Sequence, residues 1–355
     1  MSQNSSFEPQ CPLPLASDKT IRLAHGGGGH LMQKLIHEVF LEAFSNSYLT
    51  ALQDSAVLPA QDGCLAMTTD SYVVKPLFFP GGDIGSLAVH GTINDLAMMG
   101  GSPRYLSAGF ILEEGLPIVT LKQVVSSMAK AAQDCGVQIV CGDTKVVDRG
   151  KGDQIFINTT GLGVIPSSVD IGPHRLTPGD RIILSGNLGA HGIAVLSQRE
   201  GLEFSGNLVS DSAPLHTVIA DLLNHNVAIH CLRDLTRGGL ASALNELTTA
   251  AQLIMTIEES HIPISEPVRG ACEVLGLDPL YVANEGRFVM FLSPENVDEA
   301  LSILHKHEVS QEAVDIGEIQ FTSPTPHQAL VSLETRYGTR RILDLLSGEQ
   351  LPRIC

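Results

Sequence analysis

Apolar residues recur at helical spacing in the segment TLKQVVSSMAKAAQDCG, at positions i, i+3, i+4 and i+7: Leu121, Val124, Val125 and Met128. This spacing predicts an amphipathic helix with one apolar face. Gly136 follows as a helix C-cap, and the next stretch, VQIVCGDT, predicts a buried strand that runs into a Gly-Asp turn.

The same order of elements returns twice further along the chain. GDRIILSGNLGAHGIAVLSQ predicts a strand, a glycine loop and a helix, and VAIHCLRDLTRGGLASALNELTTAA predicts a strand, a charged turn and a helix. Strands that alternate with amphipathic helices are typical of α/β and α+β proteins. We therefore expect an α+β protein with α/β-like segments.

Length and turn residues together divide the chain. A chain of 355 residues suggests two domains, and prolines and glycines cluster in VIPSSVDIGPHRLTPGD between two strand-like runs. We predict an N-terminal domain over 21–168 and a C-terminal α/β domain over 169–343. The polar, Pro-rich residues 1–20 are expected to be a disordered lead-in, and residues 344–355 a mobile tail.

Charge and cysteine content exclude several classes of protein. The formal net charge of −17 argues against nucleic-acid binding, and it means that a polyanion such as ATP would need Mg²⁺ as a bridge. Seven cysteines without a C-x-x-C pair fit neither a disulfide framework nor a zinc site. No apolar run reaches the 18 or more residues of a membrane span, and the first residues lack the basic and apolar regions of a signal peptide. We expect a cytoplasmic protein that binds no membrane.

Glycines and acidic residues provide the candidate ligand groups. HGGGGH, from His25 to His30, stands just before a predicted helix, where glycines let the backbone approach an anion; a flexible turn is the alternative. Carboxylates near strand and helix ends together suit one or two Mg²⁺ ions that hold phosphates, although each acid alone is better explained by a helix cap or a turn. The predicted metal ligands are Asp54, Asp70, Asp95, Asp143 and Asp234.

Three further residues stand in ambiguous places. Glu285, in LYVANEGRFVMFL, is either a turn residue or a base at a cleft, and Lys145, in GDTKVV, has the same ambiguity. Cys355 ends the chain in LPRIC, where it is either part of a frayed end or a thiol that carries a group. A carboxylate on the same residue would raise the pKa of the thiol above its usual value of about 8.5. We therefore expect a thiol that is unreactive while the tail is free.

Read together, these segments resemble the HypE family of hydrogenase maturation factors, the carbamoyl dehydratases. The family belongs to the superfamily of aminoimidazole ribonucleotide synthetase and selenophosphate synthase. The resemblance runs from LAHGGGGH through TDSYVVKPLFFPGGDIG, LAVHGTINDLAMMG, GDTKVVDRG and RDLTRGGLASALNE to the closing PRIC. It implies a two-domain PurM-like fold, a homodimer whose N-terminal sheets form a β-barrel, and ATP between the domains.

The resemblance also implies a reaction and a set of residues. A carbamoyltransferase, HypF, would load a carbamoyl group onto Cys355, ATP would drive its dehydration to a thiocyanate, and a HypC–HypD iron scaffold would accept the cyanide for the [NiFe] site. Glu285 would take the amide proton and Lys145 would stabilise charge on the phosphorylated oxygen. The implied nucleotide-binding residues are Gly27, Gly28, Gly29, Asp54, Asp70, Asn94, Asp95, Asp143, Thr144 and Arg237.

Two departures and two alternatives accompany this prediction. Gln53 precedes Asp54 where relatives often have a second acid, and His25 stands where selenophosphate synthases carry a reactive Cys or selenocysteine. Another enzyme of the superfamily, acting on a diffusible substrate, would leave Cys355 without a purpose. A nucleotide-binding scaffold for maturation partners, with no dehydratase chemistry of its own, is the second alternative.

Overall fold

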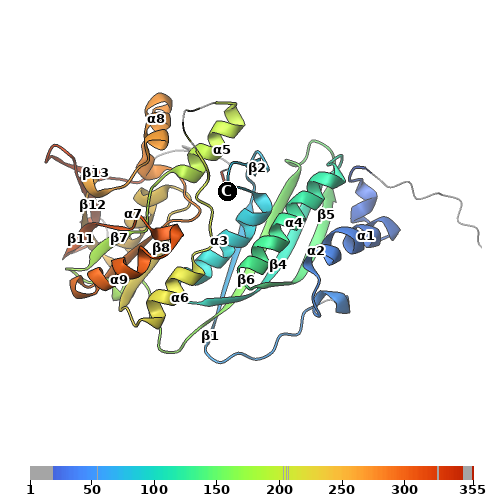
Figure 1. The fold of residues 1–355 in the computed structure, drawn as a ribbon, viewed down its shortest axis with the longest axis horizontal. Helices are drawn as coiled ribbons and strands as arrows, with labels where there is room; N and C mark the ends of the chain where they lie inside the picture. The colour runs from blue at the N-terminus through green and yellow to red at the C-terminus, as the bar shows by residue number, and fades with distance from the viewer. Residues whose placement is uncertain are drawn as a thin grey trace, which may run out of the picture.

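The computed structural model describes residues 19–53, 55–202, 204, 206, 208–325, 328–346 and 354–355, and Figure 1 shows two domains packed side by side. Each domain is built on its own sheet, so the predicted two-domain α+β fold is confirmed. Asp54 lies outside the described residues, as do most of the predicted lead-in and most of the predicted tail.

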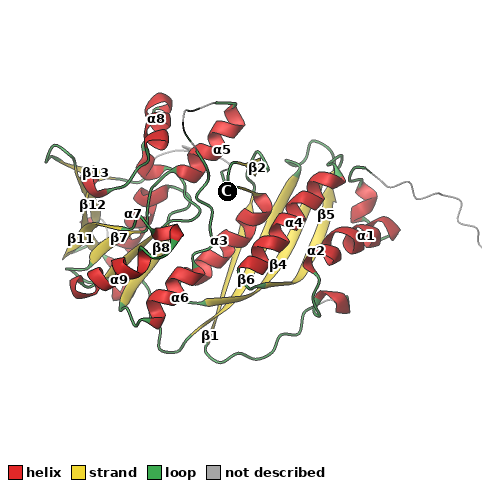
Figure 2. Cartoon of the chain, viewed as in Figure 1, coloured by secondary structure: helices red, strands yellow, loops and turns green. Residues whose placement is uncertain are grey.

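The N-terminal domain has a four-stranded sheet in the order β1-β6-β4-β5. Strand β4 runs parallel to β5, and the other neighbours are antiparallel. The strands are β1 (Cys64–Tyr72), β4 (Ser102–Glu113), β5 (Gln138–Val147) and β6 (Ile155–Ile165). A short ribbon of β2 (Phe78–Phe79) and β3 (Gly82–Asp83) leads into α3 (Ile84–Met98), and α4 (Ile118–Asp134) packs beside α3. Both helices cover the same face of this sheet (Figure 2).

The other face of the N-terminal sheet is open in the single chain. Leu65 and Met67 on β1 are 64% and 72% exposed, and Ile111 on β4 is 43% exposed. These side chains alternate with residues that face α3, because successive side chains of a strand point to opposite sides. The described sheet forms no closed barrel within one chain.

The residues before β1 form a broken helix that packs beside β5. It consists of η1 (Leu23–Gly26), α1 (His30–Leu35), the π-helical turn η2 (Ile36–Leu41) and α2 (Glu42–Phe44), followed by η3 (Leu49–Ala51). The helix predicted after the four glycines is therefore present, and Gly29 is its N-cap.

The C-terminal domain has a seven-stranded sheet in the order β13-β12-β9-β11-β7-β10-β8. Only β12 and β9 are parallel among the described pairs, so this domain is mainly antiparallel and the predicted α/β character is wrong. The alternation of helices and strands along the chain did not reveal the antiparallel pairing. Strands that are connected through a helix here are not neighbours in the sheet, so the order along the chain does not give the direction of pairing. The strands are β7 (Arg181–Leu184), β8 (Ile229–Asp234), β9 (Leu253–Glu258), β10 (Phe288–Leu292), β11 (Val314–Thr322), β12 (Leu330–Glu334) and β13 (Arg340–Leu343).

Helices pack around this second sheet: α5 (Ala190–Glu200), α6 (His216–Asn224), α7 (Gly239–Ala251), α8 (Glu266–Leu275) and α9 (Val297–Leu304). Short 3₁₀ turns lie in the segments between strands and helices: η4 (Pro173–Arg175), η5 (Glu259–His261), η6 (Pro279–Tyr281), η7 (Pro294–Asn296) and η8 (Glu308–Ser310). The strands and helices predicted at 181–184, 190–200, 229–234 and 239–251 are thus confirmed.

The two domains share buried residues. Val195, Ala283 and Ile354 belong to the same apolar cluster as the core of the N-terminal domain, and Ala97 and Met98 of α3 belong to a cluster of the C-terminal domain. In Figure 1 the chain end marked C lies beside α3, β2 and α5. The described part of the tail therefore returns to the boundary between the domains.

One local prediction is wrong. The strand after Gly136 does not end in a Gly-Asp turn, because β5 continues through Gly142 and Asp143 to Val147. Gly142 lies against β4 so closely that a Cβ atom there would stand 2.3 Å from the Ala108 carbonyl oxygen. This glycine therefore permits close pairing of two strands instead of a turn. Separately, no helix of the described residues is long and apolar enough to cross a membrane.

Candidate functional site

The predicted site residues fall into two groups. The first, called the interdomain cluster, consists of Asp70, Asp95, Asp234, Arg237, Glu285 and Cys355. The second, called the β5 edge cluster, consists of Gly27, Gly28, Gly29, Asp143, Thr144 and Lys145.

Three different elements deliver the three aspartates of the interdomain cluster. Asp70 lies near the end of β1, where its carboxylate accepts a hydrogen bond from the Ser71 backbone N–H at 2.8 Å. Asp95 lies on α3 and accepts a hydrogen bond from the Thr68 hydroxyl at 2.7 Å. Asp234 is the last residue of β8. Residues 68 and 70 share one face of β1, the face that α3 covers, so Asp70 and Asp95 approach each other.

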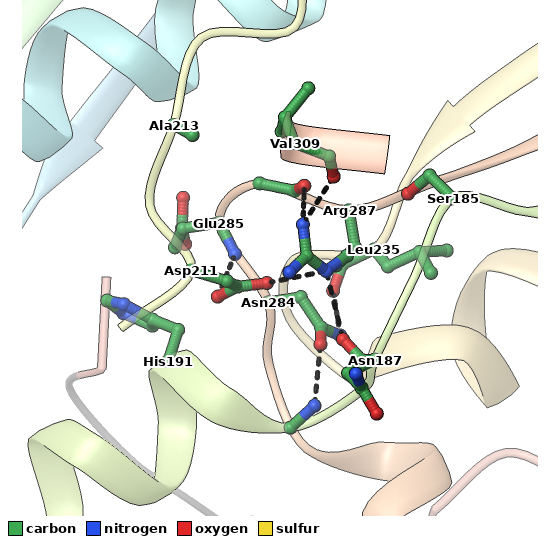
Figure 3. A network of polar contacts seen from close by, with 12 residues as sticks. Ser185, Asn187, His191, Asp211, Ala213, Leu235, Asn284, Glu285, Arg287 and Val309 are labelled. Atoms are coloured by element: carbon green, nitrogen blue, oxygen red, sulfur yellow. Dashed lines mark hydrogen bonds and ion pairs between the residues drawn. The ribbon is translucent and has the colours of Figure 1, made fainter. Parts of the chain in front are cut away.

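A polar network fixes the turn that carries Glu285 (Figure 3). Asn284 accepts a hydrogen bond from the Gly189 N–H at 2.7 Å and donates one to the Leu235 carbonyl at 3.0 Å. Arg287 donates from Nε to the Asn187 carbonyl at 3.0 Å and from Nη1 to the Val309 carbonyl at 2.8 Å. The backbone on both sides of Glu285 is therefore tied to other segments of the C-terminal domain.

Asp211 holds Glu285 itself. Its Oδ1 accepts the Glu285 N–H at 3.2 Å, and its Oδ2 lies 3.7 Å from Arg287 Nε. Gly286 must be glycine here, since a Cβ atom would stand 1.9 Å from the Asp211 carbonyl oxygen. The Glu285 side chain is thus presented from a turn with no freedom to move.

Glu285 is buried, at 3% exposed, and its Oε1 atom has no hydrogen-bond partner within the described part of the chain. Burial and then the charges of Asp234 and its neighbours hold the pKa of Glu285 well above its usual range. Burial and Asp95 raise the pKa of Asp234 to about 7. Ionising all of these acids together is therefore unfavourable unless a cation binds among them.

The turn after Asp234 also requires glycine. Gly238 and Gly239 both have positive φ, at 76° and 58°, and a Cβ atom on Gly239 would stand 2.6 Å from the Val282 carbonyl oxygen. The turn leaves Arg237 exposed before α7. The positive charge of Arg237 lowers the pKa of Cys355 and so partly offsets the effect of burial and of Glu285. The guanidinium is therefore close enough to act on the thiol electrostatically.

Cys355 lies inside the interdomain cluster. Ile354 before it is 2% exposed, and the Cys355 main-chain oxygen accepts a hydrogen bond from the Val73 N–H at 3.2 Å. Burial, and then the charge of Glu285, raise the pKa of the thiol to about 12. The thiol is therefore protonated where it is docked. The low reactivity expected of Cys355 in the free tail stays a prediction.

The β5 edge cluster is built differently. Gly26 at the start of the glycine run lies against β5, because a Cβ atom there would stand 3.0 Å from the Val146 backbone N. Lys145 forms an ion pair with Asp143, and both side chains are more than 60% solvent-exposed, at 63% and 62%. A cavity of about 270 Å³ opens beside them, lined by Phe40, Phe44, Tyr48, Phe110 and Thr144 among others. Its apolar wall suits a flat apolar or aromatic group.

The structure does not bring the two clusters together in one chain. Asp70 is level with Gly142 across the sheet, and three strand spacings of about 4.8 Å separate β1 from β5, roughly 14 Å in all. The pairing of β4 with β5 also places Lys145 beside Ile111, on the open face of the N-terminal sheet. Asp70 lies on the opposite face, which α3 covers. The roles predicted for Lys145, Asp143, Thr144 and the three glycines stay predictions.

Asn94 contacts protein groups on all sides. Its amide nitrogen donates to the carbonyls of Ala213 and Glu285 at 3.0 and 3.2 Å, and its oxygen accepts the Leu215 N–H at 2.8 Å. In the structure this side chain joins α3 to the C-terminal domain, and its predicted contact with a nucleotide stays a prediction.

The acids of the interdomain cluster fit a hard cation without forming a complete cage. Carboxylate oxygens are the ligands that Mg²⁺ prefers; among the described residues Glu285 Oε1 has no hydrogen-bond partner, and burial together with Asp95 disfavours ionisation of Asp234 without a cation. Within the described residues, no three or more His, Cys, Asp and Glu side chains are placed so as to hold a metal ion by themselves. Such a cation would share its coordination with waters and with phosphates.

Sequence reasoning missed the residues that position the cluster: His191, Asp211, Asn284 and Arg287. Asn284 and Arg287 flank Glu285 in NEGR, and polar residues beside a candidate base were a usable signal. His191 and Asp211 lie in other segments and only the fold brings them near.

Comparison with known proteins identifies the family. The model of the AIR synthase related protein N-terminal domain matches residues 52–165, and that of the C-terminal domain matches residues 177–323. The carbamoyl dehydratase HypE of Azotobacter vinelandii is 50% identical over 336 residues, which cover 95% of this chain and 97% of the relative. The chain belongs to the HypE family.

Solved structures agree with this HypE assignment. A crystal structure of the hydrogenase maturation protein HypE in complex with ATP is 49% identical and superposes with a TM-score of 0.89, over 94% of this chain and 99% of that chain. HypE in a crystal structure of a HypE–HypF complex is 45% identical, with a TM-score of 0.76, over 90% of this chain and all of that chain. The family is that of the carbamoyl dehydratases of hydrogenase maturation.

Proposed function

We propose that the protein dehydrates a carbamoyl group carried on Cys355 to a thiocyanate, at the expense of ATP, and so supplies the cyanide of a [NiFe]-hydrogenase site. The observation that carries the proposal is the position of Cys355, which is docked beside Glu285 and the acids of the interdomain cluster. ATP bound to a solved relative supports the nucleotide requirement.

The reaction balances as follows. The thiocarbamate oxygen attacks the γ-phosphorus of ATP and ADP leaves. The nitrogen loses one proton to give an iminophosphate and then a second, while the C–O bond breaks and phosphate departs. The sulfur keeps its bond to carbon throughout, and the carbon–nitrogen bond becomes a triple bond. Phosphorylation turns oxygen, a poor leaving group, into a good one.

Glu285 is the proposed proton acceptor. Its rigid turn and its partnerless Oε1 atom suit a base held in one place beside the substrate. Burial, and then the charges of neighbouring acids, hold the pKa of Glu285 well above its usual range, so its ionised form becomes more abundant as pH rises. Asp70, Asp95 and Asp234 would hold Mg²⁺, which when bound neutralises phosphate charge. Arg237 would contact the phosphates from the turn before α7.

The test is intact-mass analysis of the full-length protein with HypF, carbamoyl phosphate and Mg-ATP. The proposal predicts one carbamoyl adduct on Cys355, followed by ATP-dependent loss of one water. An adduct that never loses water would favour the scaffold alternative. Absence of any adduct would remove Cys355 as the carrier, and Cys355→Ser is the matched control.

A homodimer is part of the proposal. The open face of the N-terminal sheet exposes Leu65, Met67 and Ile111, an apolar surface that two copies would bury by joining their sheets into a barrel. Lys145 lies on this face, away from Glu285 of its own chain. A second copy would therefore supply the Lys145 that stabilises charge on the phosphorylated oxygen.

Mixed dimers test this arrangement. Copies with Glu285→Gln and copies with Lys145→Met are each expected to be inactive, but after exchange half of the dimers would contain one intact composite site. About a quarter of the wild-type activity should return. If Lys145 acts within its own chain, no activity returns.

The remaining partners follow from the same reaction. HypF would donate the carbamoyl group, in line with the solved HypE–HypF complex of relatives. A HypC–HypD iron scaffold would accept the cyanide in the cytoplasm. Transfer of labelled cyanide from Cys355 to that scaffold is the measurement that checks it.

A further inference from the structure

His191 is a buried histidine that the reaction above does not use. It lies in the first turn of α5, is fully buried, and packs against the edge of Phe79 with ring centroids 5.3 Å apart. Figure 3 shows it on α5 at the margin of the network that holds Glu285. Both of its ring nitrogens have partners.

The partners fix which nitrogen carries the proton. Nε2 lies 3.0 Å from the Ile354 carbonyl oxygen, which can only accept, so Nε2–H donates. Nδ1 lies 2.8 Å from the Ser210 hydroxyl. Burial lowers the pKa of His191, so the ring is neutral and Nδ1 accepts from that hydroxyl. Ser210 in turn accepts the Ser212 N–H at 3.1 Å.

This chain of hydrogen bonds ends at the residue before the reactive thiol. The Ile354 side chain is buried in the apolar cluster of the N-terminal domain, and the next residue, Cys355, is held through its main-chain oxygen by the Val73 N–H. The two ends of this dipeptide therefore contact opposite domains: His191 belongs to the C-terminal domain and Val73 to the N-terminal domain. These contacts hold the Cys355 thiol within the electrostatic influence of Glu285 and Arg237.

We propose that His191 is a positioning residue that recognises the docked chain end and sets Cys355 in register with Glu285. This inference rests on the proposed dehydratase function, since it assigns a residue to one step of it. The docked thiol is only partly exposed, so in this proposal HypF loads the released chain end, whereas dehydration takes place with the chain end docked. His191 thus acts on the second step and not on the first.

The test compares His191→Phe, which keeps a ring against Phe79 but removes the donor, with His191→Gln, which returns an N–H near the same place. Three rates are measured on the full-length protein: loading by HypF, single-turnover dehydration of the loaded protein at saturating Mg-ATP, and alkylation of Cys355 by iodoacetamide. His225→Phe, at a half-exposed position on the end of α6, is the matched control.

His191→Phe should slow dehydration and speed alkylation by about tenfold each, the factor that corresponds to one buried hydrogen bond worth about 1.4 kcal/mol. Loading should stay within about twofold of wild type, and His191→Gln should recover most of the dehydration rate. Ile354→Ala removes one buried side chain at the chain end and should raise the rate of Cys355 alkylation by a similar factor. In the double variant with His191→Phe, the rate should be little higher than in His191→Phe alone.

Dehydration and alkylation at wild-type rates in His191→Phe would overturn the inference. A parallel fall of loading, dehydration and melting temperature, with no recovery in His191→Gln, would also overturn it, because it would assign the histidine to folding alone. If the loaded wild-type protein never loses water, the dehydratase proposal itself fails. The alkylation rates then still report whether His191 holds the chain end.

Discussion

The interdomain cluster and the β5 edge cluster contain similar residues but are held in different ways. In the interdomain cluster, Glu285 is buried with one oxygen lacking a partner, in a turn tied by Asp211, Asn284 and Arg287. In the β5 edge cluster, Asp143 and Lys145 pair with each other in the open. Burial raises the pKa of the acids in the first cluster, whereas the acid of the second pairs with a lysine in solvent.

The difference indicates where the chemistry is. A buried, unneutralised carboxylate is costly, and a protein keeps such a group where a ligand or a reaction requires it. An exposed ion pair costs little and can open when a ligand or a second chain arrives. We therefore expect substitutions in the two clusters to have effects of very different size and kind.

The largest effect is expected for Glu285→Gln, which keeps the shape of the side chain and removes the base. Single-turnover dehydration should fall by roughly 10²–10⁴-fold, the usual contribution of a general base. In the wild type the rate should rise with pH, because the ionised form of Glu285 becomes more abundant as pH approaches its raised pKa. Loss of this pH dependence in Glu285→Gln is the accompanying measurement, and an unchanged rate would place the base elsewhere.

Gly239→Ala should destabilise the protein by about 1–3 kcal/mol, because φ is 58° there and the new Cβ atom would meet the Val282 carbonyl. Gly270→Ala on α8 is the matched control, since no atom lies within 4 Å of the new Cβ atom and φ is not positive. It should be neutral or slightly stabilising, by up to about 1 kcal/mol. Urea unfolding of both variants measures the difference; equal losses would mean that the turn tolerates a side chain.

Asp234 should make the ligand-free protein less stable as pH rises. Its pKa is raised from 3.8 to about 7, so between these values the folded protein retains a proton that the unfolded chain releases. Stability is then lost as pH increases from about 4 to about 7. Asp234→Asn removes this loss, and thermal unfolding at a series of pH values without Mg²⁺ or nucleotide compares the two. Parallel pH profiles for wild type and variant would contradict it.

The smallest effect on stability is expected at the β5 edge. Asp143→Asn should change the free energy of unfolding by less than about 0.5 kcal/mol, because the carboxylate is 62% exposed, its ion pair is with an exposed lysine, and an asparagine oxygen can still accept the Thr144 N–H. The same urea titration provides the value. A loss comparable to that of Gly239→Ala would show that the edge is as constrained as the interdomain cluster.

Sequence patterns predicted the elements better than their arrangement. The helix at 118–134 and the strand at 229–234 follow from apolar periodicity, which is local. The antiparallel order of the second sheet, and the continuation of β5 through Gly142, depend on which strand lies alongside, and that information is not local. The motifs identified Asp70, Asp95, Asp234 and Glu285 as candidates, and the structure brings these four together.

The positioning residues could not be predicted in the same way. His191 and Asp211 come from segments without a motif, and their importance arises from contacts with residues far along the chain. Lys145 illustrates the opposite case, since the motif that marks it does not reveal that its strand lies at the far edge of the sheet from β1. Motifs identify chemical groups, whereas distances between them depend on topology.

The hydrogen bonds of Asn94 have a consequence for how the acids and the base are held. This one side chain joins α3, which carries Asp95, to the backbone of Glu285 and to the segment before α6. Separating the domains would break these bonds and pull the acids away from the base. The arrangement of Asp95 and Glu285 therefore depends on the two domains remaining in contact, because one side chain ties both of them together.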